Sequence, residues 1–244
     1  MTKVLVVGAA GKMGRAVQAA ASERSDLTIS ATVDQGDDLA ALGACDVYVD
    51  FSTPAATLAV ARAARATKTA AVIGTTGLDE DAEAALAELA SVAPIVVAAN
   101  FSLGVNLMLG LVRQAARALG PAWDAEVVET HHKLKRDAPS GTALAIAKAI
   151  AAGHGSNYDQ VKRHSRDGDV GPRPRGEIGV ATVRGGGVVG EHTAYFFGHD
   201  ERIEISHRAT SRGIFASGAL VAAAWVVGKA PGRYTMLDVL GLPS

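Results

Sequence analysis

The sequence predicts an α/β protein in which a domain built on a parallel sheet is joined to an α+β domain with a mixed sheet. Three observations lead to this expectation. Strand-like and helix-like segments alternate over residues 1 to about 101, the first strand-like segment runs directly into a glycine-rich turn, and the alternation stops after residue 101. The length of 244 residues is enough for one large domain or two modest ones.

In the first hundred residues, short runs rich in β-branched residues are separated by alanine-rich segments with helical spacing. The expected strands are Val4–Val7, Thr28–Val33, Val47–Phe51, Ala70–Ile73 and Ile95–Ala98, and the expected helices are Gly14–Ser22, Pro54–Ala66 and Glu80–Ala90. Thr53 before Pro54 is a good N-cap followed by proline at the first helical position. Strands that alternate with helices indicate a parallel sheet covered on both faces.

The pattern changes after residue 101. The expected elements are a helix at Leu103–Leu119, a strand at Ala125–Glu129, a helix at Ser140–Ala152, strands at Ile178–Val183, Val188–Phe197 and Arg202–Arg208, a helix at Phe215–Val227 and a short amphipathic end at Met236–Leu240. Residues 153–177 are rich in Gly, Asp, Arg and Pro and show no apolar period, which is typical of a mobile loop or lid. Adjacent strands joined through Gly185–Gly187 indicate a mixed or antiparallel sheet.

Composition excludes several classes of protein. A formal net charge of −1 gives no electrostatic reason to expect nucleic acid or an anionic membrane as partner. Because Cys45 is the single cysteine, neither an internal disulfide nor a cysteine-based zinc site can form. The apolar run after Lys3 is far shorter than a signal-peptide core, and no stretch approaches the ~20 apolar residues of a membrane span. We therefore expect a cytoplasmic protein.

A glycine-rich turn follows the first strand and opens the first helix, which is the position of a Rossmann-like dinucleotide site. Glycines there allow a tight turn and close approach to a pyrophosphate, and the helix N-terminus supplies N–H groups. The turn residues are Gly8, Ala9, Ala10, Gly11, Lys12 and Met13. The spacing ending at Gly14 is G-x-x-G-x-x-G rather than the commonest G-x-G-x-x-G, and a purely structural turn is the alternative.

Asp34 strengthens the prediction of a dinucleotide site. It lies at the end of the second expected strand, 20 residues after Gly14 (34 − 14), where a carboxylate binds the adenosine ribose hydroxyls. Two further segments end expected strands on the same edge of the sheet, where the nicotinamide would lie; they are Gly74, Thr75 and Thr76, and Ala98, Ala99, Asn100 and Phe101. The alternative reading is a solvated loop acid and ordinary strand-to-helix loops.

The stretch from Glu129 to Thr142 carries the most chemistry. His131 and His132 follow a strand, and a histidine can give or take a proton near neutral pH. Lys135 can hold an anion or act as an acid, while Gly141 and Thr142 can present N–H groups to a carboxylate at a helix start. If the strand continues, the two histidines point to opposite sides, which disfavours a metal site. A basic, solvated turn with a capping serine is the structural alternative.

The run from His131 to Ala143, His-His-x-x-Lys-x-Asp-Ala-Pro-Ser-Gly-Thr-Ala, resembles the signature of the 4-hydroxy-tetrahydrodipicolinate reductase (dihydrodipicolinate reductase) family of diaminopimelate and lysine biosynthesis. The resemblance spans nearly the whole chain. It includes Gly8–Gly14, Val49–Ser52, Val72–Gly77, Ala98–Ser102, Gly190–Thr193 and Ser211–Arg212.

The resemblance implies an enzyme that uses NADH or NADPH to reduce a dicarboxylate ring substrate. It implies a nucleotide domain at residues 1–101 plus 213–244, and a substrate domain at 102–212 that also builds a homotetramer. By resemblance, His131 and Lys135 are proton donors, and His132, Gly141 and Thr142 contact the substrate. The glycine turn, Asp34, Gly74–Thr76 and Ala98–Phe101 match the nucleotide contacts. Gln35 departs from the pattern, because many members have arginine there, and this leaves the choice between NADH and NADPH open.

Two other functions compete with this one. A semialdehyde dehydrogenase needs a cysteine nucleophile in the second domain, and Cys45 lies in the first, so we reject it. A non-catalytic nucleotide-sensing module would keep the glycine turn but has no use for His131 and Lys135 beside a helix start.

Overall fold

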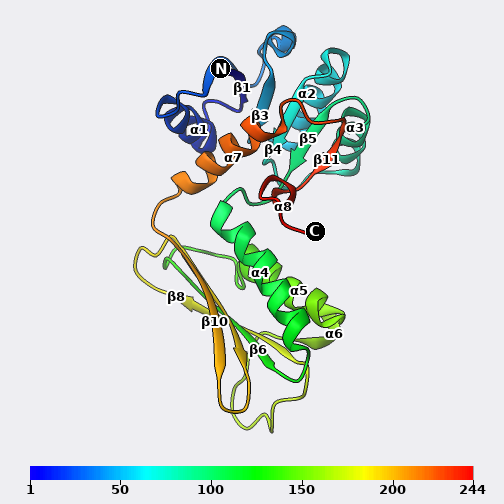
Figure 1. Cartoon of the computed structure of the whole chain (residues 1–244). Coiled ribbons are helices and arrows are strands. Elements are labelled where there is room, and N and C mark those ends of the chain that lie inside the picture. The colour runs from blue at the N-terminus through cyan, green and yellow to red at the C-terminus, as the bar shows by residue number, and fades with distance from the viewer. Residues whose placement is uncertain (244) are drawn as a thin grey trace. The chain divides into compact units, whose positions relative to one another are not determined.

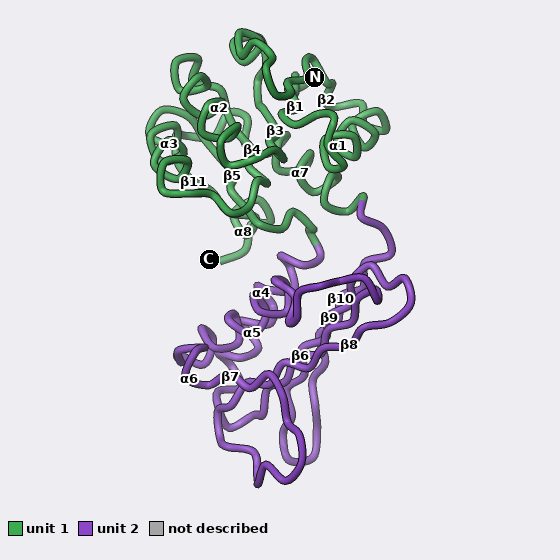
Figure 2. The backbone as a smooth tube through the Cα atoms, turned by 180° about the vertical axis from the view of Figure 1, so that it is seen from behind, with its two compact units in different colours: residues 1–103, 213–244 green, residues 104–212 purple. Residues whose placement is uncertain are grey.

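The computed structural model describes residues 1–243. The chain forms two compact units, which Figure 2 shows in different colours. The first unit comprises Met1–Leu103 and Gly213–Ser244, and the second comprises Gly104–Arg212. The chain therefore leaves the first unit once and returns to it.

The first unit is built on a parallel sheet with the strand order β11-β5-β4-β3-β1-β2. The strands are β1 (Thr2–Val7), β2 (Leu27–Val33), β3 (Val47–Asp50), β4 (Ala70–Ile73), β5 (Pro94–Val97) and β11 (Gly232–Tyr234). The prediction of a parallel sheet is confirmed. Strand β11 was not expected, because three residues are too few to show a period.

Helices cover both faces of this sheet (Figure 1). They are α1 (Lys12–Ser22), the 3₁₀ helix η1 (Leu39–Ala44), α2 (Pro54–Thr67), α3 (Glu80–Ala90), α7 (Gly213–Val226) and α8 (Met236–Val239). Residues of α1 and α7 pack on one face, and residues of η1, α2 and α3 pack on the other. As predicted, Thr53 caps α2 by accepting a hydrogen bond from the Ala56 N–H, with Pro54 at the first helical position.

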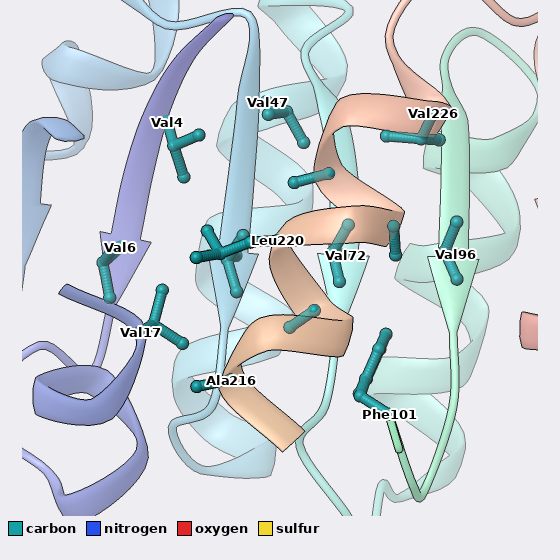
Figure 3. Close-up of a cluster of buried hydrophobic side chains, with 14 of the residues drawn as sticks. Val4, Val6, Val17, Val47, Val72, Val96, Phe101, Ala216, Leu220 and Val226 are labelled. Atoms are coloured by element: carbon teal, nitrogen blue, oxygen red, sulfur yellow. The ribbon is translucent and has the colours of Figure 1, made fainter. Parts of the chain in front are cut away.

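Helix α7 brings the end of the chain back onto the sheet. Figure 3 shows Ala216, Leu220 and Val226 of this helix against valines of β1, β3, β4 and β5. Leu220 and Val226 are fully buried, and burial of such a side chain contributes about 1.5–3 kcal/mol. A Cβ at Gly218 would overlap the carbonyl oxygen of Phe101, so glycine lets α7 approach the chain that follows β5.

The second unit contains a mixed sheet with the strand order β10-β9-β6-β8-β7. The strands are β6 (Asp124–His131), β7 (Lys162–Arg163), β8 (Ile178–Arg184), β9 (Gly190–Phe197) and β10 (Arg202–Ala209). β6, β7 and β8 run parallel to one another, and β9 is antiparallel to both β6 and β10. The mixed sheet is confirmed. Although Gly185–Gly187 join β8 to β9, these two strands do not pair with each other, because they flank β6.

Helices α4 (Leu103–Leu119, all but its first residue in the second unit) and α5 (Gly141–His154) cover one face of the mixed sheet (Figure 1). Buried and half-buried residues alternate along β6, starting with half-buried Asp124. The buried row contains Ala125, Val127, Glu129 and His131, so the last two continue the face that is packed under the helices. This alternation places the site residues described below.

The expectation of a mobile loop or lid over residues 153–177 is wrong where the segment forms regular elements. Helix α5 extends to His154, and the short helix α6 (Tyr158–Val161) leads directly into β7. The remainder is tied down by ion pairs: Arg166 lies 2.7 Å from Glu126, and Arg173 lies 2.7 Å from Asp124. A four-residue helix and a two-residue strand are too short to show periodicity, and several of the charges that made the segment resemble a loop form ion pairs.

None of the helices in residues 1–243 is both long enough and apolar enough to cross a membrane.

Candidate active site

The glycine-rich turn has the backbone that a dinucleotide site needs. Gly8 adopts a φ of +74°, which favours glycine. A Cβ at Gly14 would lie 2.2 Å from the carbonyl oxygen of Gly8, so only glycine lets α1 start this close to β1. Gly11 is the N-cap of α1 and makes no side-chain cap hydrogen bond. The first turn of α1 therefore keeps backbone N–H groups for a phosphate.

Asp34 stands beside this turn, as predicted from its spacing. Its two carboxylate oxygens each accept from the Ala10 N–H at 3.1 Å, which ties the end of β2 to the glycine turn. A cavity of about 620 Å³ opens here. Its lining includes Gly8, Gly11, Asp34, Gln35, Ser52 and Thr53. These are groups suited to a ribose and a pyrophosphate.

Asp50, at the end of β3, organises the neighbouring loops. It is fully buried and accepts hydrogen bonds from Ser52 Oγ at 2.5 Å, Thr57 Oγ1 at 2.6 Å and Thr75 Oγ1 at 3.2 Å. Burial raises the pKa of Asp50, although the hydrogen bonds from these hydroxyl groups oppose the shift. Of the predicted nicotinamide-side residues, Thr75 is therefore a partner of a buried carboxylate.

The remaining nucleotide candidates lie at the carboxyl ends of β4 and β5. The Gly74 N–H donates to the Asp50 carbonyl, and a Cβ at Gly74 would overlap the ring of Phe51. Thr76 and Ala99 are exposed, Ala98 and Asn100 are half-buried, and Phe101 is buried with its ring 5.6 Å from that of Phe51. None of Gly74–Thr76 and Ala98–Phe101 lines the 620 Å³ cavity, so the predicted nucleotide residues fall into two groups along one sheet edge.

In the second unit, the chemistry gathers at the carboxyl end of β6. His131 is buried, and its Nδ1 lies 2.5 Å from Oε2 of Glu129, two residues earlier on the same face of the strand. Glu129 is fully buried, and Arg184 of β8 binds both its oxygens at 2.8 and 2.9 Å. Burial alone would raise the pKa of Glu129. Hydrogen bonds from Arg184 and His131 outweigh burial and hold this pKa below its ordinary value.

His192 of β9 lies against His131, with ring centroids 5.2 Å apart. Its Nε2 is 3.1 Å from Oγ of Ser140, and this hydroxyl also accepts from the Ala143 N–H as the N-cap of α5. Burial, and then the neighbouring His131, lower the pKa of His192 to about 4. His192 is therefore neutral near pH 7 and does not compete with His131 for a proton.

The other predicted residues surround this cluster. Lys135 Nζ donates to both carboxylate oxygens of Asp137 at 2.8 Å. His132 Nε2 lies 3.4 Å from Nη2 of Arg212. Gly141 and Thr142 are the first two residues of α5. The structure thus brings His131, His132, Lys135 and the start of α5 into one part of the second unit.

Several members of both sites received no role from the sequence. Glu129 and His131 are two residues apart on a strand, so their shared face was readable from the strand period. Arg184, His192 and Arg212 come from distant positions, and pairing with them depends on the order of the strands. Asp50 and Ser52 sit at a strand end next to the predicted loops, which was a usable signal. Among residues 1–243, no group of three or more His, Cys, Asp or Glu side chains could hold a metal ion.

Two family models match the chain and together cover most of it. The model described as dihydrodipicolinate reductase, N-terminus, matches residues 2–101, and the one described as dihydrodipicolinate reductase, C-terminus, matches residues 104–240. The second match includes α7, which packs in the first unit of this structure.

Whole-length relatives agree with the family models. A 4-hydroxy-tetrahydrodipicolinate reductase of Anaeromyxobacter dehalogenans (strain 2CP-C) is 47% identical over 99% of this chain and 98% of its own. One of Alkalilimnicola ehrlichii is 48% identical over 99% of each chain. Among solved structures, a dipicolinate-bound dihydrodipicolinate reductase from Paenisporosarcina sp. TG-14 has the same fold, with a TM-score of 0.82, 24% identity and 98% of each chain covered.

Proposed function

The chain belongs to the dihydrodipicolinate reductase family, and we propose that it reduces 4-hydroxy-2,3,4,5-tetrahydrodipicolinate to 2,3,4,5-tetrahydrodipicolinate with loss of water. The reaction consumes NADH or NADPH and belongs to diaminopimelate and lysine biosynthesis. The observation that carries the proposal is the buried, carboxylate-held His131 beside Lys135 and the start of α5.

The first unit fits a pyridine dinucleotide. A pyrophosphate requires free N–H groups and a close approach of the backbone, which the uncapped start of α1 and the glycine at position 14 provide. An adenosine ribose requires a space beside a carboxylate, which the 620 Å³ cavity beside Asp34 provides. We assign nucleotide contacts to the glycine turn, Asp34, Gly74–Thr76 and Ala98–Phe101. When bound, the reduced nicotinamide supplies a hydride.

The second unit fits a dicarboxylate ring. Two carboxylates need cations or N–H donors, and this unit offers Lys135, the pair of His132 and Arg212, and the backbone at Gly141 and Thr142. Loss of the hydroxyl and a neighbouring proton as water leaves a carbon–carbon double bond conjugated to the ring imine. A hydride added to the far carbon leaves an electron pair on the next carbon, which must then receive a proton.

We assign the proton donation to His131 and Lys135. Glu129 occupies Nδ1 of His131, so Nε2 is the atom that exchanges a proton. Gly190 leaves room there, because a Cβ at this position would lie 3.0 Å from His131 Nε2. Lys135 is held by Asp137, and its ammonium group either donates a proton or binds a substrate carboxylate.

A turnover assay tests the proposal. Purified protein and freshly generated substrate are mixed, and loss of NADH and of NADPH absorbance is followed separately. We expect turnover with the wild type and a fall in kcat of about 10²–10⁴-fold in His131→Gln and Lys135→Ala, with NADH still bound. His199→Gln is the matched control, because His199 is exposed in the turn between β9 and β10 and should keep full activity. Nucleotide binding without turnover would favour the sensing module.

We also propose that the protein works in the cytoplasm as a homotetramer that assembles through the second unit. In support, β10 is an edge strand whose residues are half-buried or exposed, and Val183 and Ile203 expose much of their apolar surface. Light scattering on the purified protein should give the mass of four chains. A monomer that retains full activity would contradict the assembly and leave the reductase function standing.

A further inference from the structure

The Glu129 carboxylate is the best-coordinated buried charge in the second unit. Oε1 accepts from Arg184 Nη2 at 2.9 Å, the Ser140 N–H at 3.0 Å and Thr182 Oγ1 at 3.3 Å. Oε2 accepts from Arg184 Nη1 at 2.8 Å and faces His131 Nδ1 at 2.5 Å. A buried carboxylate is costly unless it is paired and hydrogen-bonded, and here both conditions are met.

This arrangement fixes which nitrogen of His131 carries a proton. The carboxylate is paired with a guanidinium, its pKa is lowered, and it can only accept hydrogen bonds. Nδ1 of His131 must therefore be the donor in both the neutral ring and the imidazolium. Only Nε2 gains or loses a proton, and that nitrogen is the one beside Gly190.

Glu129 also reaches the start of α5. Its bond to the Ser140 N–H anchors the residue whose hydroxyl caps α5, directly before Gly141 and Thr142. Arg184 reaches the same turn through a bond from Nη2 to the carbonyl oxygen of Asp137 at 2.6 Å. One carboxylate thus connects the proton donor to the segment assigned to the substrate.

We propose that Glu129, held by Arg184, is a positioning residue of the reaction: it keeps a proton on Nδ1 of His131, leaves Nε2 as the atom that exchanges a proton, and fixes that ring relative to the start of α5. This inference rests on the proposed function, because it gives Glu129 a role in proton delivery to the ring carbon. Glu129 is fully buried, so its role is exerted through His131 and the start of α5.

The charges around His131 define what the removal of Glu129 should do. Glu129 on β6 stabilises the imidazolium, whereas Arg184 on β8 opposes it. His192 on β9 is neutral near pH 7. In the following turn, Lys135 is paired with Asp137, and Arg212 lies beside His132. Glu129→Gln removes the carboxylate that accepts from Nδ1 of His131, so the ring loses the group that fixes its tautomer.

The test compares Glu129→Gln with Glu126→Gln. Glu126 lies on the same strand and also pairs with arginines, Arg166 and Arg173, but its side chain belongs to the opposite row of β6. We expect kcat of Glu129→Gln to fall by about tenfold to 10³-fold with KM for NADH unchanged. Glu126→Gln should keep the wild-type kcat.

Two further measurements separate positioning from stability. Adding Glu129→Gln to His131→Gln should cause no additional loss of kcat, because a residue that acts through His131 has nothing left to position. Glu129→Gln combined with Arg184→Met removes both charges, so it should fold without an unpaired buried cation and remain slow. Full kcat in either Glu129 variant, or independent losses in the double variant with His131, would overturn the proposal.

Nitrogen NMR of ¹⁵N-histidine-labelled protein reads the tautomer without relying on turnover. Neutral His131 should carry its proton on Nδ1 in the wild type and shift toward Nε2–H in Glu129→Gln. A wild type with neutral His131 protonated on Nε2 overturns the positioning role. By contrast, absence of reductase activity in the wild type defeats the proposed function and leaves the tautomer result intact.

Discussion

His192 should contribute a measurable part of the loss of stability of the second unit on acidification. This residue is 4% exposed, its Nε2 faces Ser140 Oγ, and its Nδ1 has no hydrogen-bond partner within residues 1–243. Burial, followed by the neighbouring His131, lowers the pKa of His192 from 6.5 to about 4. The folded protein therefore resists protonation of a ring that the unfolded chain protonates freely.

The direction and size of the effect follow from these two pKa values. Above pH 6.5 both states are neutral at this site, and His192 adds no pH dependence. Between pH 6.5 and about 4 the unfolded chain binds a proton that the folded protein does not, so the free energy of unfolding falls as the pH falls. A difference of about 2.5 units, at ~1.36 kcal/mol per unit, corresponds to about 3 kcal/mol.

Urea unfolding of His192→Asn and the wild type between pH 8 and pH 4 measures this contribution. Trp123 lies in the second unit and Trp225 in the first, so a Trp225→Phe background makes Trp123 fluorescence the reporter. The loss of unfolding free energy between pH 7 and pH 4 should be about 3 kcal/mol smaller in His192→Asn, whereas the control His199→Asn should follow the wild type. If the free energy of unfolding depended on pH in the same way in His192→Asn and in the wild type, His192 would not be a buried neutral ring.

Three further predictions concern the nucleotide unit and the ion pairs of Arg173. The wild type should use NADH at least as well as NADPH, and Gln35→Arg should shift the ratio of the two kcat/KM values toward NADPH by roughly one to two powers of ten through one charge-assisted contact. A strong wild-type preference for NADPH that Lys12→Ala abolishes would show that Lys12 controls the choice instead. Gly14→Ala should weaken NADH binding at least about tenfold in a fluorescence titration, because its Cβ would lie 2.2 Å from the Gly8 carbonyl oxygen; unchanged affinity would contradict the need for close packing there. Arg173→Ala should speed amide hydrogen exchange in residues 164–177, because it removes the ion pairs with Asp124 and Glu126. Exchange rates equal to those of the wild type would show that these ion pairs do not hold the segment in place.

Local patterns were enough to predict most of the first unit, although not the short elements β11 and η1. Strands such as β1 are buried on both faces and read as continuous apolar runs, and the glycine turn and Asp34 follow them at a recognisable spacing. The cap at Thr53 was also local, since a threonine followed by proline needs no tertiary partner to be recognised.

The sequence was less informative wherever partners are distant in the chain. Glu129 meets Arg184 only because β8 pairs with β6, and nothing local distinguishes this order from a hairpin of β8 with β9. The same holds for His192, which β9 brings beside His131. Ion pairs such as Arg173 with Asp124 turned a loop-like composition into a segment tied to β6.

Transfer of deuterium tests the central claim most directly. The protein is incubated with freshly generated substrate and with NADH that carries deuterium at carbon 4 of the nicotinamide on the transferred face, and the product is analysed by mass spectrometry and NMR. The account predicts one deuterium on the ring carbon that lost its hydroxyl, with the neighbouring carbon taking its proton from solvent, and this product should almost vanish in His131→Gln. Tetrahydrodipicolinate without deuterium, or NADH that stays unoxidised beside bound substrate, would contradict it.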